Sequence, residues 1–196
     1  MDLSPVTLEG RTVRLEPLSK THAPDLVRYA LDPELWRFTT TVIASSDDLD
    51  GYIARALEEQ RMQKTLAFAT IDRATGRAVG STRFANADHG NRRVEIGWTW
   101  LGTPFQRTAF NTEAKLLMLE HAFEQLGCIR VELKTGHQNA KSRAAISRLG
   151  AKQEGILRHH MILSDGRLRD TVYFSILRDE WPAVRTDLMA KLERTR

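Results

Sequence analysis

The sequence predicts an α+β protein built around one mixed β-sheet, and three observations favour that class. Short segments that alternate apolar and polar residues, or that are continuously apolar, predict strands. Longer segments with apolar residues three or four positions apart predict helices. Most of the strands follow one another through hairpins, with one strand–helix–strand crossover in the middle of the chain.

About seven strands are predicted. Alternation in "RTVRLEPL" predicts the first, the turn "RATG" joins the second to the third, and Asp165–Gly166 is a strong hairpin signal between the last two. "CIRVELKT" is almost continuously apolar, as expected of a central strand. We expect the strands at residues 11–18, 65–72, 77–86, 91–102, 128–135, 152–164 and 167–177.

Five helices are predicted from their apolar stripes and capping residues. The clearest spans residues 112–127, and its stripe is Leu116, Leu119, Phe123 and Leu126. The other helices are expected at residues 19–31, 45–63, 139–150 and 178–195. The residues expected to start or end them are Ser19, then Ser46 or Asp47, Gly127, Asn139, Gly150 and Pro182.

Length and composition indicate one domain over residues 1–196. Apolar residues are 41% and charged residues 28% of the chain, which is ordinary for a soluble protein. The single cysteine, Cys128, excludes an internal disulfide framework and a multi-cysteine zinc site, so we interpret it as a core residue and expect no metal.

Charge and hydropathy limit the partners. A net charge of +4 suits a small anionic ligand, but the basic residues are too dispersed to predict nucleic-acid binding. No apolar run is long enough to span a membrane, and the first ten residues lack a secretory pattern. We therefore expect a cytoplasmic protein that binds neither membranes nor nucleic acids.

The stretch "GTPFQRTAFNTEAK", residues 102–115, places a Gln-Arg pair directly before a helix. Free N–H groups in the first turn of a helix attract anions, and Arg107 adds a full positive charge. On its own the stretch fits two interpretations equally well: a phosphate-binding loop, or simply a capped helix start.

Four segments in order carry a family resemblance: "VEIGWTWL" (94–101), "PFQRTAFNTEAKLLMLEHAF" (104–123), "RVELKTGHQNAKSRAAISRLGAKQEGILR" (130–158) and "DGRLRDTVYFSIL" (165–177). Together they resemble the GNAT superfamily of acyl-CoA N-acyltransferases, in its RimJ/RimL-like branch of ribosomal-protein N-terminal acetyltransferases. The resemblance implies a sheet of about seven strands with helices on both faces, whose fourth and fifth strands splay apart. It extends over nearly the whole chain in element order.

The resemblance also implies acetyl-CoA as the cofactor, with its pyrophosphate over a Q/R-x-x-G-x-G/A loop. Here Ala109 and Asn111 stand at the small positions, so binding would rely on helix N–H groups and Arg107, and Asn111 could cap the helix. The remaining cofactor residues expected in the loop are Gln106, Thr108, Phe110 and Thr112.

The pantetheine arm is implied to enter the splayed gap beside residues 94–101, pairing with open backbone groups. Trp98 on this strand is expected to contact the cofactor. Strict alternation would place residues 94, 96, 98 and 100 on one face and Glu95, Gly97, Thr99 and Leu101 on the other.

Glu95 is the leading candidate for the base that takes the proton of the acceptor amine, because the family commonly uses a carboxylate on this strand. The alternative is an ordinary strand residue paired with Arg92 or Arg93. His89, His159 and His160 are rival bases or substrate contacts, and His89 and Asp170 are expected at the acceptor side.

The leaving thiolate of CoA also needs a proton. Many family members place a Tyr in the helix after residue 139, but Ile146 stands at that position, and Ser142 is implied as the replacement. Asn139 would bind an amide near the acetyl group. The structural alternative is that Asn139 only caps the helix and Ser142 is a neutral helical residue.

The function implied is acetyl transfer from acetyl-CoA to a primary amine, by direct attack in a ternary complex. The acceptor would be a protein N-terminus or a small amine. Alternatives are transfer of another acyl group such as succinyl, or a CoA-binding regulatory module without catalysis. A homodimer is compatible with this branch.

Overall fold

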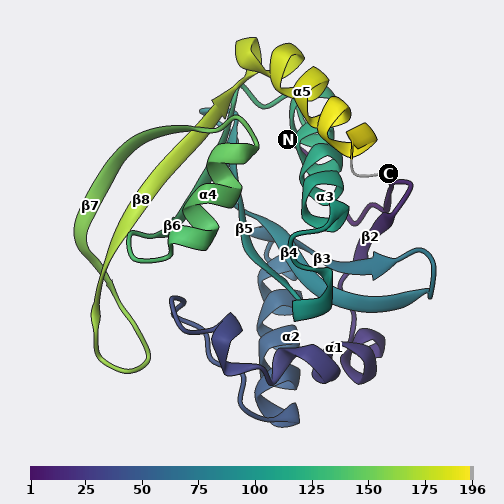
Figure 1. Ribbon diagram of the computed structural model, residues 1–196, viewed down its shortest axis with the longest axis vertical. Coiled ribbons are helices and arrows are strands. Elements are labelled where there is room, and N and C mark those ends of the chain that lie inside the picture. The colour runs from purple at the N-terminus through teal and green to yellow at the C-terminus, as the bar shows by residue number, and fades with distance from the viewer. Residues whose placement is uncertain (195–196) are drawn as a thin grey trace.

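The computed structural model describes residues 1–194, and it contains one mixed sheet of eight strands in the order β1-β2-β3-β4-β5-β6-β8-β7 (Figure 1). This confirms the α+β class with one strand more than predicted, because β1 is too short to show alternation. The strands are β1 (Leu8–Glu9), β2 (Val13–Pro17), β3 (Thr65–Asp72), β4 (Arg77–Asp88), β5 (Arg93–Leu101), β6 (Arg130–Gly136), β7 (Lys152–Ile162) and β8 (Leu168–Leu177).

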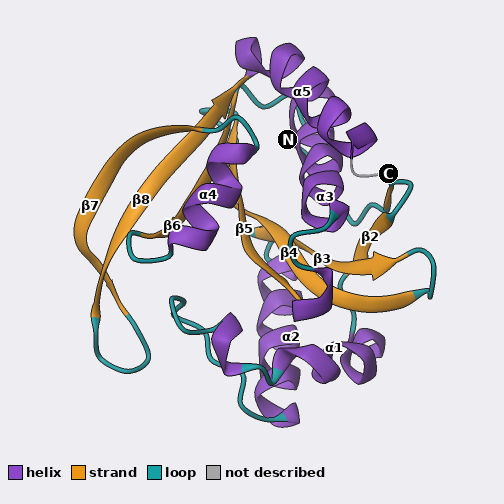
Figure 2. Cartoon of the chain, viewed as in Figure 1, coloured by secondary structure: helices purple, strands orange, loops and turns teal. Residues whose placement is uncertain are grey.

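Helices cover both faces of the sheet (Figure 2). Side chains of β3 alternate between two cores: Leu66 and Phe68 pack in the core of α3, α4 and α5, whereas Ala67 and Ala69 pack in the core of α1 and α2. The helices are α1 (Ala23–Ala30), α2 (Ser46–Arg61), α3 (Ala109–Glu120), α4 (Ala140–Arg148) and α5 (Trp181–Arg194).

Several helix ends differ from the prediction because local hydrogen bonds decide them. Ser45 caps α2 by accepting from the N–H of Asp48, so neither Ser46 nor Asp47 is the cap. Ser19 begins a short 3₁₀ turn that leads into α1. The predicted helix at 112–127 begins at Ala109 and closes in a π-helical turn, His121–Gln125. The predicted end of the last helix at residue 195 lies outside the described residues.

The stripe predicted for α3 is largely correct. Leu119, Phe123 and Leu126 are buried in the larger core, and Leu116 is half-buried against it. Cys128 is fully buried in the same core, as predicted. None of the helices in residues 1–194 combines the length and the apolar character that a bilayer crossing requires.

The sheet opens in its middle, between β5 and β6. These two strands pair in parallel over three residues only, from Arg93–Arg130 to Glu95–Glu132. Beyond Glu95, β5 continues to Leu101 beside β4 and β6 continues to Gly136 beside β8. In Figure 1 the two halves of the sheet turn away from each other below this point. The predicted splay of the fourth and fifth strands is therefore confirmed.

The buried carboxylate of Glu113 fastens α3 to the start of the sheet. Its Oε1 accepts from the N–H of Arg11 at 2.8 Å, and its Oε2 accepts from the N–H groups of Thr12 and Val13 at 2.7 and 2.8 Å. Three main-chain donors at the turn between β1 and β2 thus depend on one side chain. α3 is thereby held in register with the strands that it covers.

We expect Glu113→Gln to lower the free energy of unfolding by about 2 to 3 kcal/mol, because the amide nitrogen would face backbone donors that need an acceptor. Urea denaturation measures the change. The matched control is Glu120→Gln on the same helix, whose partly exposed carboxylate pairs with Arg185 at 2.9 Å. This control should cost less than about 1 kcal/mol. Equal losses in the two variants would contradict the role of Glu113.

Candidate functional site

The opening between β5 and β6 is bordered by the first turns of two helices. α3 follows β5 through a short loop, and α4 follows β6. The side chain of Lys141, in the first turn of α4, donates to Oε1 of Gln106, in the loop before α3. This contact brings the two helix N-termini together at one end of the opening.

The loop before α3 is held by its own side chains. Gln106 donates through Nε2 to the carbonyl of Leu101 at 2.8 Å, and Thr108 donates through Oγ1 to the carbonyl of Phe105 at 2.7 Å. Thr108 also accepts from the N–H of Phe110 at 3.3 Å, so it is the cap of α3. The suggestion that Asn111 caps this helix is wrong, because Asn111 already lies inside it.

One residue of this loop adopts the left-handed backbone conformation that favours glycine, and that residue is Arg107 rather than Ala109 or Asn111. Both of these residues are helical, whereas Arg107 has a φ of +61°. Arg107 is exposed and has no acidic partner among the described residues. The N–H groups of Ala109 and Asn111, which α3 leaves without a partner, and the guanidinium of Arg107 can together hold a phosphate.

Asn139 caps the start of α4, as the structural alternative for this residue predicted. Its Oδ1 accepts from the N–H of Ser142 at 3.0 Å, which leaves Nδ2 able to donate to a ligand. The hydroxyl of Ser142 is half-buried and forms no hydrogen bond with another described residue. Ile146 is buried in the larger core and offers no proton. Ser142 therefore carries the hydroxyl of α4 nearest its N-terminus.

A β-bulge in β5 overturns the predicted alternation of this strand. The register with β4 shifts between Ser81 and Arg83, and Trp98 has a φ of +48°. As a consequence, the ring of Trp98 lies 5.2 Å from the guanidinium of Arg83, on the same face of the sheet as Gly97. Trp100 lies on this face too, where it packs against Trp36 in the smaller core. Thr99 points to the opposite face, towards α3. Glu95 and the two tryptophans thus share a face, contrary to the prediction.

Glu95 lies at the point where the two strands part, and its side chain is buried. Its Oε2 accepts from Nδ2 of Asn86 at 2.7 Å and pairs with Nζ of Lys134 at 2.7 Å. Its Oε1 forms no hydrogen bond with another described residue and lies beside Gly97, where a Cβ would be only 2.9 Å away. The expected alternative partners, Arg92 and Arg93, do not pair with it. One oxygen is anchored, and the other is free at the bulge.

Two of the predicted histidines, His160 and His89, differ in their side-chain contacts. His160 stacks edge-on against Tyr173 at 5.9 Å, and Lys134, the partner of Glu95, lies 5.6 Å from the same ring. His89 is exposed in the turn between β4 and β5 and has no side-chain partner among the described residues. His160 is therefore connected to Glu95 through two side chains.

Asp170 and His159 hold β7 against β8. Oδ1 of Asp170 accepts from the N–H of His159 at 2.7 Å, and His159 has a φ of +47° where the strand register shifts. Asp170 therefore helps to shape the long β7–β8 arm through Oδ1, and the acceptor contact expected of it stays a prediction.

The β7–β8 turn is fastened to the loop that follows α1. Arg167 donates to the carbonyl of Arg37 at 2.9 Å, and Arg169 donates to the carbonyl of Phe38 at 3.4 Å. A hollow of about 490 Å³ lies between these segments. Burial lowers the pKa of Arg169, which also senses the charge of Glu95. These contacts border the side of the sheet on which Glu95 lies.

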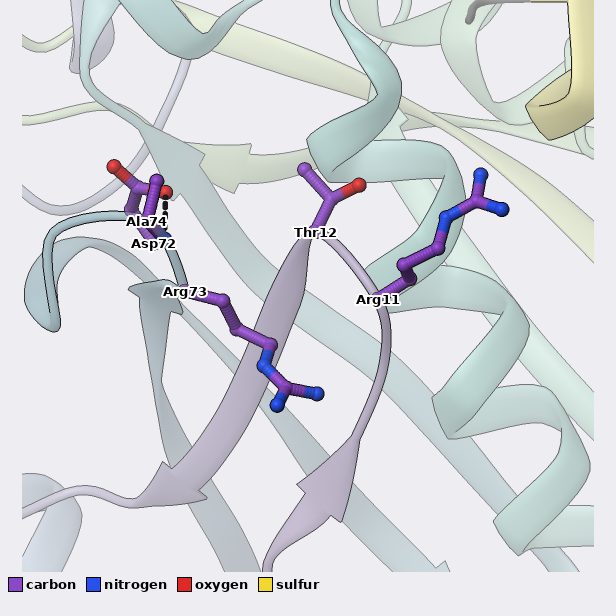
Figure 3. Close-up of a pocket in the computed structure, with 5 residues that line it drawn as sticks. All are labelled: Arg11, Thr12, Asp72, Arg73 and Ala74. Atoms are coloured by element: carbon purple, nitrogen blue, oxygen red, sulfur yellow. Dashed lines mark hydrogen bonds between the residues drawn. The ribbon is translucent and has the colours of Figure 1, made fainter.

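A second hollow, of about 420 Å³, lies at the ends of β2 and β3 (Figure 3). It is lined by Arg11, Thr12, Asp72, Arg73 and Ala74. Arg73 donates to the carbonyl of Gly10 and pairs with Glu9 at 3.5 Å, so its guanidinium links the end of β3 to the turn between β1 and β2. In the sheet order this hollow is three strands away from the opening between β5 and β6.

Sequence reasoning missed Lys115. Its ammonium is buried beneath the bulge and donates to the hydroxyls of Thr82 at 2.8 Å and Thr99 at 2.6 Å. Burial lowers the pKa of Lys115 to about 7, and no acidic group of the described residues lies within ion-pair distance. The sequence held a signal: Lys115 is four residues before Leu119 and falls on the apolar stripe of α3.

Comparisons with known proteins agree with this geometry. Residues 12–152 match a family model described as "Acetyltransferase (GNAT) domain". The Bacillus subtilis (strain 168) protein "Putative ribosomal N-acetyltransferase YdaF" is 35% identical over 106 residues, which are 54% of this chain and 57% of that protein. The match thus spans little more than half the length of that relative.

Two solved structures extend the comparison. A GCN5-related N-acetyltransferase from Brucella melitensis is 33% identical, with a TM-score of 0.89 over 95% of this chain and 85% of that one. Mycobacterium smegmatis RimJ, solved in complex with CoA-disulfide, is 24% identical, with a TM-score of 0.79 over 95% of this chain and 93% of that one. The second likeness concerns the fold alone.

The lowered pKa of Lys115 makes a prediction about stability. Between about pH 7 and pH 10.5 the unfolded chain holds a proton on Lys115 that the folded protein lacks, so the free energy of unfolding rises with pH over this window. Relative to Lys115→Met, the wild-type protein should be least stable below about pH 7 and should recover as the pH approaches 10.5.

Urea denaturation of both proteins across this range provides the measurement, because groups that titrate alike cancel in the difference. A difference that stays constant from pH 7 to 10 would contradict a buried Lys115 with a lowered pKa.

Proposed function

This chain belongs to the acetyltransferase (GNAT) family, and we propose that it transfers an acetyl group from acetyl-CoA to a primary amine by direct attack in a ternary complex. The observation that carries the proposal is the opening between β5 and β6, with the carboxylate of Glu95 where the strands part. The name of the Bacillus subtilis relative makes a ribosomal protein N-terminus the first acceptor to test. Such an acceptor would place the protein in the cytoplasm.

The residues along the opening fit an acyl-CoA. From Ile96 to Leu101 one edge of β5 has no strand partner, which leaves backbone groups for the amides of a pantetheine arm. The pyrophosphate would lie over the first turn of α3 beside Arg107. Gln106 and Thr108 shape the loop, and Nδ2 of Asn139 would donate to an amide near the acyl group.

Acetyl-CoA would supply an activated thioester, and the protein would manage the protons around it. Oε1 of Glu95 would take the proton of the amine, directly or through water, while Lys134 and Asn86 keep the side chain in place through Oε2. The hydroxyl of Ser142 would give a proton to the sulfur as the carbon–sulfur bond breaks. Trp98, on the face of Glu95, would border the acyl group and the incoming amine.

Ile146 favours one alternative, a CoA-binding module without catalysis, because the tyrosine common in the family is missing. An assay for free CoA separates the two functions. The protein is incubated with acetyl-CoA and a panel of N-terminal peptides and polyamines, and released thiol is measured. Burial raises the pKa of Cys128 to about 11, so the only protein thiol should react slowly. CoA binding without release would support the alternative, and succinyl-CoA in parallel tests the acyl group.

Glu95→Gln should lower kcat by about a hundredfold or more, because the amide cannot accept the proton of the amine. The loss should be greatest at low pH, where more of the amine is protonated and a base is needed most. Glu154→Gln, which removes a more exposed carboxylate paired with Arg130, is the control. Wild-type rates for Glu95→Gln across the pH range would exclude Glu95 as the base.

Arg107→Ala should weaken CoA binding by about tenfold, since a charge-assisted hydrogen bond contributes roughly 1.5 kcal/mol or more. Its effect on the KM of the acceptor should be small. Calorimetric titration with CoA provides the measurement, and Arg77→Ala, an exposed arginine at the start of β4, is the control. If both variants bind CoA like the wild-type protein, Arg107 does not hold the pyrophosphate.

A further inference from the structure

Lys115 is a buried amine that the proposed chemistry does not use. It lies on α3 with 4% of its surface exposed, and Oγ1 atoms of Thr82 and Thr99 are its two oxygen partners. Its remaining neighbour within bonding range is the sulfur of Met118, at 4.0 Å. Burying an ammonium group without a carboxylate costs free energy, and only neutral hydroxyls offset that cost here.

The two threonines stand on either side of the bulge. Thr82 lies on β4 at the position that the register shift leaves without a partner, and Thr99 lies on β5 just past Trp98. The hydroxyls are 2.8 Å apart, and each is 3.4 Å from the carbonyl oxygen of Gly97. Lys115 therefore bridges the two strands where their main-chain pairing is interrupted.

The bulge holds a strained residue. A bulky side chain such as that of Trp98 seldom adopts a φ of +48°, and such a conformation persists only where its surroundings impose it. If the bulge relaxed into a regular ladder, the residues after Gly97 would exchange faces. Trp98 and Trp100 would then leave the face of Glu95, and Gly97 would shift relative to Oε1.

We propose that Lys115 is a positioning residue for acyl transfer, which acts through Thr82 and Thr99 to hold the β5 bulge and thereby the backbone of Gly97 and Trp98 beside Glu95. The inference rests on the proposed function, because it assigns the bulge to the place where the thioester meets the amine. A methionine would fill the same site among Ala114, Met118 and Leu119 without burying a charge. The lysine adds hydrogen bonds to the hydroxyls of Thr82 and Thr99 that a methionine cannot form.

Lys115→Met tests the proposal by two measurements. Amide hydrogen exchange of residues 96–101 should become faster, because the interrupted ladder loses its bridge. With acetyl-CoA and an acceptor, kcat should fall by about tenfold or more, since a displacement of about 1 Å at a reacting centre can cost about a hundredfold. The KM for acetyl-CoA should change little, because the phosphate-binding loop is not altered.

Two further variants make the result decisive. Leu116→Met, at a half-buried position of the same helix, should leave both exchange and kcat unchanged. Thr99→Val removes one hydroxyl without changing the side-chain shape and provides the same test if Lys115→Met does not fold. If Lys115 acts through Thr99, the double variant Lys115→Met/Thr99→Val should have the same kcat as the less active of the two single variants.

Unchanged exchange at residues 96–101 in Lys115→Met would overturn the proposal, whatever the activity. Faster exchange with wild-type kcat would overturn it too, because the bulge would then not matter for transfer. If the wild-type protein releases no CoA with any acceptor, the proposed function fails and the positioning role of Lys115 in acyl transfer fails with it. The exchange measurement still decides separately whether Lys115 holds the bulge.

Discussion

The early separation of β5 from β6 is the constraint on which the rest of the structure depends. The two strands share three residue pairs and then part, yet neither loses its strand conformation. Each is held along its other edge, β5 by β4 and β6 by β8, the latter over seven consecutive pairs. The pairing of each strand along its other edge therefore maintains the opening between β5 and β6.

The two ends of this opening carry opposite charges. Near the first turns of α3 and α4, Arg107 and Lys141 have no acidic partner among the described residues, which suits a polyphosphate. Where the strands part, one carboxylate is fixed by a lysine and an amide so that a single oxygen remains free. Under the proposed function, one end would bind the carrier and the other would deprotonate the acceptor.

The sequence predicted the architecture well because the elements have strong local signals. The hairpin at Asp165–Gly166, the glycine stops and the apolar stripe of α3 all agree with the structure. The bulge was missed because alternation counting assumes an uninterrupted strand, although the glycine inside it, Gly97, is a residue type that often marks a bulge. The start of α3 was placed too late because Thr108, and not a residue after the aromatic Phe110, provides the cap. Lys115 was overlooked because a lysine within a helix is normally exposed.

A crystal structure of the protein grown with acetyl-CoA would test the proposed site directly. We expect the pantetheine arm to pair with the backbone of β5 between β5 and β6, the pyrophosphate to lie over the first turn of α3, and the acetyl carbon to lie on the side where Oε1 of Glu95 is free. A structure with CoA bound elsewhere, or with β5 and β6 closed into a continuous ladder past Glu95, would contradict it.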